Sequence, residues 1–336
     1  MKLNFEQICS VSMGAVRTKA AHQGIHLYRF TEEQEEIYKR ANEDFHMKTF
    51  ASAGMKLSFE TDSRELFLKV YLTKGSTRTY FSFDIFANGK PVGYLDNYSD
   101  VTLPRDYTTI QLPLGEFSKT FDLGKGTKKV SIYLPWSVSV EIRELSLDDN
   151  AFVKPVRPTK KMLMLGDSIT HGYDALRPSK RYTAQIAEAF DAEEINKGIG
   201  GEMFFPPLAK ARENFEPDYI TVAYGSNDWR KTDGMDFRDK CHDVYAALSK
   251  HYPNAQIFAI APIWRKDYTD ERPFGAFSKV AEYVEEIVKE FENIIFINGF
   301  DFVPQNEDYF GDLRLHPNDK GFDYYFQNLY KEMKKQ

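Results

Sequence analysis

The spacing of apolar residues changes near residue 150, and this change restricts what each half of the chain can fold into. Up to about residue 148, apolar and polar residues mostly alternate, as at Leu66, Leu68 and Val70. Further on, apolar residues form short continuous runs separated by stretches of helical period. Alternation is typical of strands with one buried face, and continuous runs are typical of strands buried on both faces. The pattern predicts an antiparallel N-terminal part and a parallel α/β C-terminal part.

The N-terminal part, residues 1–152, is predicted to be a β-sandwich of the jelly-roll kind. Asn88-Gly89 lies between two alternating segments and predicts a hairpin turn. One helix is expected near residues 31–50, because Thr31 and Gln34 have the spacing of a capping box. Residues 153–160 contain two prolines among basic residues and are expected to be a linker.

The C-terminal part, residues 161–336, is predicted to be a flavodoxin-like domain, with about five parallel strands between two layers of helices. Its strands are expected at 162–165, 219–223, 256–261 and 294–298, with a weaker one at 193–197. Helical segments are expected near 180–190, 237–250, 275–291 and 318–333.

Composition excludes several classes of function. The net charge is −6 and the charges are interspersed, which argues against a nucleic-acid partner. No run reaches 18 apolar residues, and the N-terminus has no apolar core of signal-peptide length, so we expect no membrane association and a cytoplasmic location. Two cysteines, Cys9 and Cys241, make neither a disulfide framework nor a metal site, and no cofactor is expected.

Polar candidates follow the ends of the expected parallel strands, where ligands bind in open α/β sheets. Ser168 follows the first strand, Gly201 follows the second and Asn227 follows the third, while His316 lies beyond the fifth. A histidine can take the proton of a serine hydroxyl and make it a nucleophile. Backbone N–H groups and an Asn amide can hold the oxyanion that forms next. The pattern predicts acyl transfer, with activity falling below about pH 6 as His316 is protonated.

Four sequence blocks resemble those of the SGNH, or GDSL-type, esterase and acylhydrolase family. They are Gly166-Asp167-Ser168-Ile169-Thr170, Asn196 with Gly198 and Gly201, Gly225-Ser226-Asn227-Asp228, and His316-Pro317-Asn318. The resemblance covers about residues 160–336. It implies that Ser168 is the nucleophile, that His316 is the general base, and that Ser168 N–H, Gly201 N–H and the Asn227 amide form the oxyanion hole.

The acid of this family usually lies three residues before the histidine, but here that position is Leu313. Asp312, four residues before His316, is the preferred candidate, because a small adjustment of the loop could bring it to the imidazole. The alternative is a Ser–His dyad in which a backbone carbonyl holds the ring.

An N-terminal sandwich before such a domain is similar to the two-domain deacetylases of carbohydrate esterase family two. This resemblance implies a substrate that is a small-molecule or oligosaccharide ester, in particular an O-acetylated carbohydrate. Alternatives are a thioesterase, a phospholipid deacetylase, an acyltransferase, or a sugar-binding protein with a vestigial catalytic domain. A homo-oligomer is compatible with the sequence.

Aromatic and basic residues beyond the third and fourth strands are candidates for contact with the sugar. Trp229, Trp264 and Arg265 could stack on a sugar face or bond its hydroxyls, or they could cap the core. His171 could touch substrate or be a solvated loop residue. Asp167 is expected to accept loop N–H groups and not to act as the catalytic acid.

Overall fold

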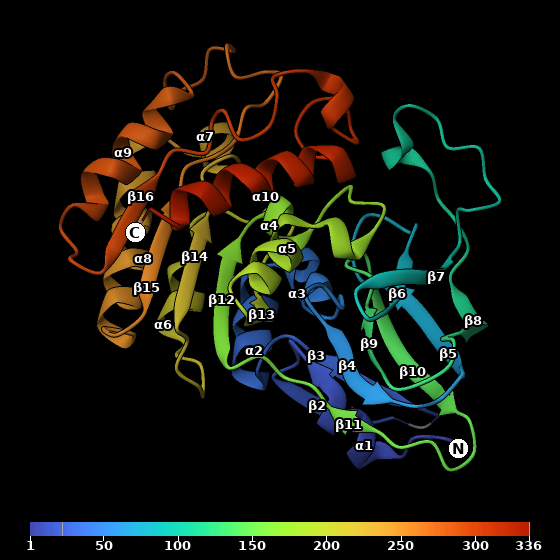
Figure 1. Cartoon of the computed structure of the whole chain (residues 1–336). Coiled ribbons are helices and arrows are strands. Elements are labelled where there is room, and N and C mark those ends of the chain that lie inside the picture. Colours follow the sequence, from blue (N-terminus) through green and yellow to red (C-terminus); the bar gives the residue numbers. More distant parts are fainter. Residues whose placement is uncertain (22, 336) are drawn as a thin grey trace.

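Two antiparallel sheets pack face to face in the N-terminal half and a parallel sheet forms the centre of the C-terminal half (Figure 1). The structure, a computed structural model, describes residues 1–21 and 23–335. The first sheet has the order β1-β4-β9-β6-β7, with β11 beside β4, and the second has the order β2-β3-β10-β5-β8. The predicted sandwich is confirmed. The bounds of the first sheet are β1 Ser12–Met13, β4 Lys56–Thr61, β6 Ser82–Ala87, β7 Lys90–Asp96, β9 Lys128–Tyr133 and β11 Lys154–Pro155. Those of the second are β2 Arg17–Ala20, β3 Ile25–Tyr28, β5 Glu65–Lys74, β8 Gly115–Asp122 and β10 Val138–Leu147.

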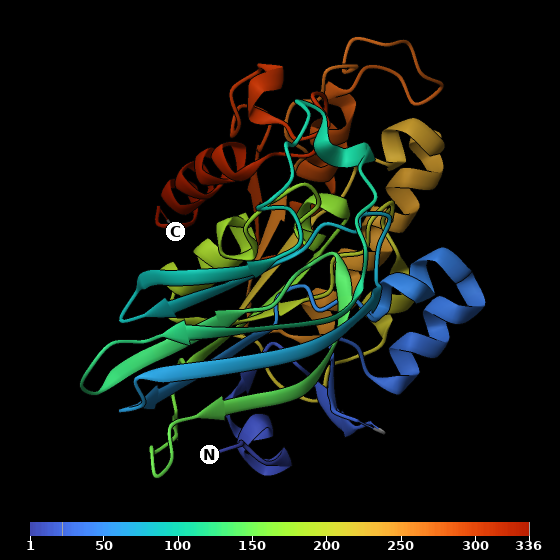
Figure 2. The same cartoon turned by 90° about the vertical axis from the view of Figure 1, so that its right-hand side faces the viewer.

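The alternating residues meet between the two sheets, as their period predicts. Leu66, Leu68 and Val70 of β5 are all at most 1% exposed and belong to one core with residues of the facing sheet. The β6–β7 hairpin turns at Asn88-Gly89, where both residues have positive φ, as a type I′ turn requires. Figure 2 shows the long, twisted strands of the sandwich from the side.

The C-terminal sheet has the order β13-β12-β14-β15-β16, and every pair in it is parallel. This is the strand order of the flavodoxin-like fold, so the predicted fold class is confirmed. One face is covered by α6, α8 and α9, and the other by α5 and α10. The strands are β12 Lys160–Gly166, β13 Ala192–Asn196, β14 Tyr219–Ala223, β15 Gln256–Ile260 and β16 Ile294–Ile297. The helices are α4 Ser168–His171, α5 Tyr182–Ala189, α6 Pro206–Lys210, α7 Asp228–Lys231, α8 Gly234–His251, α9 Ser278–Val288 and α10 Asp319–Met333.

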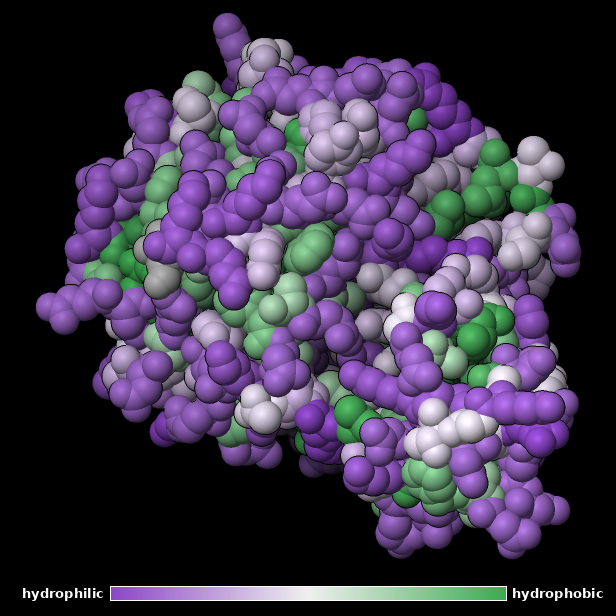
Figure 3. Space-filling model, viewed as in Figure 1, coloured by the Kyte–Doolittle hydropathy of each residue, from purple (hydrophilic) through white to green (hydrophobic). Residues whose placement is uncertain are grey.

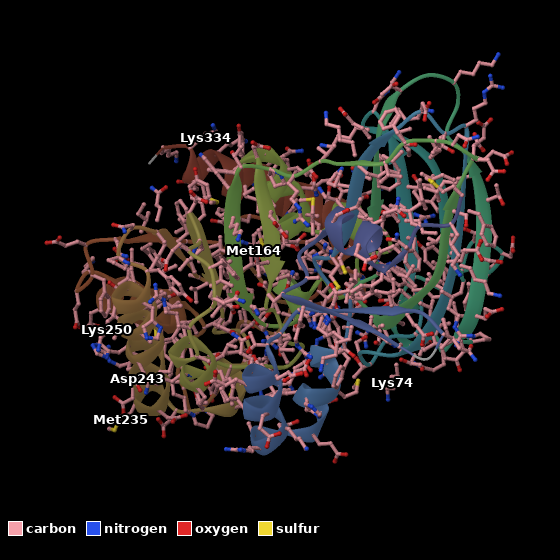
Figure 4. All side chains as sticks on the ribbon, turned by 90° about the horizontal axis from the view of Figure 1, so that it is seen from below. Lys74, Met164, Met235, Asp243, Lys250 and Lys334 are labelled. Carbon is pink, nitrogen blue, oxygen red and sulfur yellow. The ribbon has the colours of Figure 1, made fainter. Side chains whose placement is uncertain are left out.

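Strand β12 is buried from Met162 to Gly166, while one side of helix α8 faces solvent. Met164 on β12 lies in the middle of the domain, whereas Met235, Asp243 and Lys250 lie at its edge along α8 (Figure 4). The surface seen in Figure 3 is mostly hydrophilic, with small and separate hydrophobic patches. None of the helices in the described segments combines the length and the apolar character needed to cross a lipid bilayer.

The helix expected near 31–50 is two helices, α2 (Glu32–Ala41) and α3 (Glu43–Thr49), which follow the short N-terminal helix α1 (Phe5–Val11). Thr31 and Gln34 form the predicted capping box of α2. Asn42 breaks the helical run because it is extended, with φ −166°, and its side chain caps α3 by accepting from Phe45 N–H. The apolar period continues across this break, which is why the pattern predicts a single helix.

These helices pack on the C-terminal domain, and this contact joins the two halves. Tyr38 of α2 is buried in the core that α6 and α8 share. The Lys197 ammonium donates to Arg29 O at 2.6 Å and to Gln34 Oε1 at 2.9 Å. The segment expected as a linker, 153–160, contains β11, which pairs with β4 of the sandwich. The two domains therefore share buried polar and apolar contacts beyond the connecting segment.

Candidate active site

Ser168 begins α4 directly after strand β12 ends at Gly166, with Asp167 between them. Asp167 caps this helix, since its carboxylate accepts from Ile169 N–H at 2.9 Å, and burial raises the pKa of Asp167 to about 6. Gly166 is required, because a Cβ there would lie 2.1 Å from Thr170 Oγ1 and 2.8 Å from Ala223 O. The tight strand-to-helix turn holds the Ser168 hydroxyl at the carboxyl edge of the sheet. Asp167 has the structural role that the sequence predicts.

His316 lies on a closed loop between β16 and α10. Phe310 and Pro317 form an isolated antiparallel bridge across the base of this loop, and Gly311 N–H donates to His316 O at 2.8 Å. Leu313 inside the loop adopts φ +59°, a left-handed conformation that non-glycine residues rarely take. This turn absorbs the extra residue between the aspartate and the histidine. Asp312 therefore reaches His316 although it lies four residues before it in the sequence.

Ser168, His316 and Asp312 form one hydrogen-bonded chain. Ser168 Oγ lies 2.8 Å from His316 Nε2, and His316 Nδ1 lies 2.8 Å from Asp312 Oδ2. The other Asp312 oxygen accepts the backbone N–H groups of Arg314, Leu315 and His316 at 3.0, 2.8 and 3.1 Å. A carboxylate, and not a backbone carbonyl, therefore holds the imidazole. Chemically, a serine bonded to an imidazole that a third group orients is the arrangement that activates a nucleophile.

The carboxylates around His316 favour its charged form. Burial by itself lowers the pKa of His316, but the charge of Asp312 and the contacts with Asp174 outweigh it and raise the pKa to about 9. Burial likewise opposes the charge of Asp312, yet His316 holds the pKa of that carboxyl well below its usual range. The sequence alone places the loss of activity below about pH 6. The raised pKa of His316 moves the pH at which activity is lost upward, because His316 must lose its proton before it can accept one from Ser168.

A second carboxylate near the imidazole, Asp174, is absent from the sequence prediction. Its Oδ2 lies 3.4 Å from His316 Nδ1, and its side chain is fully buried. Arg78 and Tyr80 of the sandwich donate to Asp174 Oδ1 at 2.9 and 2.7 Å. Tyr107, also of the sandwich, donates to its backbone oxygen at 2.5 Å. No local motif marks Asp174, since its role depends on contacts with residues that are 67–96 positions away.

The three groups predicted for the oxyanion hole lie at the same pocket. Ser168, Gly201 and Asn227 all line it. Within residues 1–21 and 23–335, neither the Ser168 nor the Gly201 backbone amide donates a hydrogen bond, so both N–H groups are free for a ligand. The Asn227 amide nitrogen donates to Glu202 O at 2.9 Å and, over a longer distance of 3.5 Å, to Asp167 Oδ2, and these contacts fix the side chain at the pocket. Gly201 has φ +90°, a conformation that favours glycine.

The loop that carries Gly201 is held from both domains. Arg29 of the sandwich is 0% exposed and donates to the backbone oxygens of Asn196 and Gly198, both at 3.0 Å. Lys48 donates to Gly200 O at 2.7 Å, and Lys231 donates to Gly201 O at 3.0 Å. Burial lowers the pKa of Arg29 to about 9, so this charge is kept at a cost in solvation. The hydrogen bonds that Arg29 donates to the glycine loop offset this loss of solvation.

His171 is neither solvated nor in contact with the pocket. It is 0% exposed, its Nε2 lies 3.0 Å from Trp136 O of the sandwich, and Gly200 N–H donates to its Nδ1 at 3.3 Å. Burial holds the pKa of His171 well below its ordinary value, so the ring is neutral. Nδ1 accepts, and Nε2 therefore carries the proton. Both interpretations of His171 drawn from the sequence are wrong.

The residues predicted to bind substrate, Trp229, Trp264 and Arg265, are buried and lie outside the pocket. Trp229 is 0% exposed and donates from its ring nitrogen to Gly275 O at 2.9 Å. Trp264 packs against Phe310, and Arg265 is held by Ser226 O and by Asp267. This prediction is wrong because the side chains turn toward the core after the strand ends. Strand position gives the edge of the sheet but not the direction of each side chain.

The pocket above Ser168 has a volume of about 430 Å³ and lies between the two domains. The sandwich side contributes Lys48, Thr77, Arg78, Asp106 and Thr108. Tyr173 is 4% exposed and lines the pocket, and its hydroxyl has no hydrogen-bond partner among the described residues. The C-terminal side is formed by Ser168, Tyr173, Gly200, Gly201, Asn227, Arg230, Asp312, Arg314, Leu315 and His316.

Asp174, Asp312 and His316 bring potential metal ligands within 4.8 Å of one another. Their atoms are already engaged, because Asp174 binds Arg78 and Tyr80, and Asp312 accepts three backbone N–H groups. His316 Nδ1 points between the two carboxylates and donates to Asp312. Hydrogen bonding accounts for this cluster, and we assign no metal to it.

Comparison with solved structures shows the same two-domain fold in proteins of low sequence identity. A salicylyl-acyltransferase from a tetracycline biosynthetic pathway is 17% identical, with a TM-score of 0.77, and the match covers 96% of this chain and 94% of that one. A protein of Bacteroides ovatus described as GDSL-like lipase is 18% identical, with a TM-score of 0.77 and coverage of 100% and 97%. An acetyl xylan esterase from the rumen bacterium Butyrivibrio proteoclasticus is 17% identical, with a TM-score of 0.63 and coverage of 100% and 98%.

A family two carbohydrate esterase from Clostridium thermocellum, solved with cellohexaose, is 14% identical and has a TM-score of 0.62, over 85% of this chain and 93% of that one. No curated protein matches the sequence. Residues 164–324 match the model of the GDSL-like lipase/acylhydrolase family. This range includes Ser168, Gly201, Asn227, Asp312 and His316. The C-terminal half of the chain is therefore similar to the GDSL-like lipase/acylhydrolase family over this range.

Proposed function

We propose that the protein is a serine esterase that removes short acyl groups, acetyl in particular, from carbohydrates. The observation that carries the proposal is the hydrogen-bonded chain from Ser168 through His316 to Asp312, which ends at an open pocket. Free amides of Ser168 and Gly201 and the fixed side chain of Asn227 lie at the same place.

In the first half of the reaction, Ser168 Oγ forms a bond to the ester carbonyl carbon while its proton moves to His316 Nε2. The carbonyl oxygen becomes an oxyanion and accepts hydrogen bonds from Ser168 N–H, Gly201 N–H and the Asn227 amide. Asp312 stabilises the imidazolium and keeps the ring in place. The tetrahedral intermediate collapses, and the bond to the leaving oxygen breaks. His316 donates its proton to that oxygen, and the sugar hydroxyl is released.

In the second half, water attacks the acyl group on Ser168 and gives its proton to His316. The oxyanion forms again in the same hole. Collapse of this intermediate breaks the bond to Ser168 Oγ, which takes back the proton, and the short carboxylic acid leaves. Both halves use the same three side chains in the same positions.

Two features support a small polar substrate. The pocket volume of about 430 Å³ lies within the range of small-ligand sites, and hydroxyl, amide and charged side chains dominate its lining. Leu315 and Tyr173 are its main apolar surfaces, which suits a short acyl group better than a lipid tail. Structural neighbours include an acetyl xylan esterase and family two carbohydrate esterases. The sandwich contributes one wall, so both domains contact the substrate.

A second candidate is acyl transfer to an alcohol other than water. A neighbour that matches over almost the whole length is an acyltransferase, and the acyl-enzyme chemistry would be the same. The ratio of transfer to hydrolysis in the presence of added alcohols distinguishes the two functions.

The test is a screen for acetate release from acetylated oligosaccharides by the wild type, by Ser168→Ala and by Ser118→Ala. Ser118 is exposed on β8 and serves as the matched serine control. We expect release with the wild type and the control, and none above background with Ser168→Ala. Release that persists without Ser168 contradicts the mechanism. Tight glycan binding with no release by the wild type would favour the sugar-binding alternative.

A further inference from the structure

The pocket above Ser168 carries positive charge in a protein whose net charge is −6. Four basic residues line it, Lys48, Arg78, Arg230 and Arg314, against the carboxylates of Asp106 and Asp312. Two of these basic groups are neutralised by neighbours. Lys48 is paired with Asp44, and Arg78 is paired with the buried Asp174.

Arg230 is not neutralised. It lies on α7, three residues after the oxyanion candidate Asn227, and its side chain is exposed. Across the described residues, its guanidinium forms no ion pair and donates no hydrogen bond. A charged side chain without a partner at the edge of a pocket can bind a group of opposite charge with little rearrangement.

Arg314 has only a weak partner. It lies two residues before His316 and is 45% exposed, and its nearest carboxylate is Asp267 at 3.9 Å. Asp267 already forms close contacts with Arg265, at 2.6 and 3.0 Å, and with Arg272 at 3.5 Å. Three guanidinium groups share the single carboxylate of Asp267. The positive charge of Arg314 is therefore only partly compensated, and it can interact with a ligand.

The charge of Arg314 acts on Arg230. Partial burial and the charges of Arg265 and Arg314 lower the pKa of Arg230, against the opposing charge of Asp267. Both side chains also line the same pocket, so their charges act on the same space. Asp106, on the opposite wall, already caps Thr108 with its Oδ1 and lies on the sandwich.

We propose that Arg230 and Arg314 form a subsite for an anionic group on the alcohol part of the ester, such as the carboxylate of an acylated acidic sugar. The inference rests on the proposed esterase function. Guanidinium groups suit this role because their planar N–H pairs match a carboxylate. The subsite lies beside the residues that hold the oxyanion and the imidazole, so it would fix the substrate next to Ser168.

The experiment compares acetate release from acetylated glucuronic acid and from acetylated glucuronamide, which differ only in charge at one group. We expect kcat/KM for the acid to exceed that for the amide by about ten-fold or more, the size of one charged hydrogen bond. The preference should shrink as salt is added, because exposed charges are screened. Arg230→Gln and Arg314→Gln should each reduce the preference, and the double variant should remove it.

The amide substrate and an exposed arginine elsewhere provide the controls. All three arginine variants should keep the melting temperature of the wild type, which shows that they are folded, and each should lose less kcat/KM for the glucuronamide ester than for the glucuronic acid ester. Arg64→Gln, an exposed arginine on the sandwich, should leave the preference unchanged. Equal rates for acid and amide in the wild type, or a preference that survives the double variant, overturn the subsite.

Failure of the esterase function gives a different result. Acetate release from acetylated glucuronamide that persists in Ser168→Ala contradicts the catalytic mechanism, whatever the charge preference. Hydrolysis that requires Ser168 but shows no charge preference leaves the esterase function intact and overturns only the subsite. Competitive inhibition of 4-nitrophenyl acetate hydrolysis by glucuronate and glucuronamide, compared in wild type and double variant, gives the same distinction without turnover of the sugar.

Discussion

Replacing Asp312 with asparagine tests whether this carboxylate supports His316. Asparagine keeps an oxygen for the three backbone N–H groups that Asp312 accepts, so the loop should keep its shape. It removes the charge 2.8 Å from His316 Nδ1 and presents an amide there. The change therefore separates the effect of the charge from that of the loop.

The size of the effect follows from the pKa of His316. The neighbouring carboxylates raise this pKa to about 9. An ordinary histidine has a pKa of about 6.5, so the net effect of burial, which opposes the charge, and of the carboxylates, which favour it, stabilises the imidazolium by about 3 kcal/mol, or a few hundred-fold. Asp312 is the nearer of the two carboxylates, and its loss also removes the group that orients the imidazole ring. In a related triad, the same substitution lowers kcat by roughly 10⁴-fold. We expect kcat to fall about 10³-fold.

The assay is the initial rate of acetate release over a range of pH, with Asp308→Asn as the control. Asp308 lies just before the same loop and is exposed, where it pairs with Arg105. The control should keep full activity, while Asp312→Asn should lose activity and shift the midpoint of kcat/KM to lower pH. A loss of less than about ten-fold, with an unshifted midpoint, would refute the role of Asp312 and leave Asp174 as the supporting carboxylate.

Three further changes test other parts of the site. In the wild type, kcat/KM should rise with pH through neutrality, reach half of its maximum near pH 9 and level off above it, because His316 accepts a proton only when neutral; a plateau already reached at pH 7 contradicts this. Asn227→Ala should lower kcat by roughly 10²–10³, the cost of one oxyanion donor, with little change in KM; an unchanged kcat in steady-state assays excludes Asn227 from the hole. Arg29→Met should lower the free energy of unfolding by at least about 3 kcal/mol, because four buried backbone oxygens lose a charged donor; chemical denaturation measures this, and a loss below about 1 kcal/mol contradicts it.

Features that depend on neighbouring residues could be predicted from the sequence. The capping box at Thr31 and Gln34 and the turn at Asn88-Gly89 are local, and both are found. The edge of the parallel sheet at which Ser168 and His316 meet follows from strand order, because parallel strands end on one side. For the same reason the distance between them in sequence did not matter.

Features that depend on side-chain direction or on distant contacts could not be predicted. Trp229 and Trp264 follow the correct strands but turn inward, and the apolar pattern does not show this. Asp174 approaches His316 only because sandwich residues hold it, and Leu313 closes the gap to Asp312 by adopting a positive φ. Arg29 is buried by contacts across the domain interface, where a sequence alone would place an arginine on the surface.

The central claim is that Ser168 is a nucleophile activated by His316, and covalent labelling tests it most directly. The wild type is treated with a serine-directed organophosphonate, and intact mass and peptide mapping give the number and position of the labels. One label per chain on Ser168, absent in Ser168→Ala and much slower in His316→Ala, is the predicted result. A folded wild type that hydrolyses acetyl esters but takes no label on Ser168, or takes it on another residue, would contradict the account.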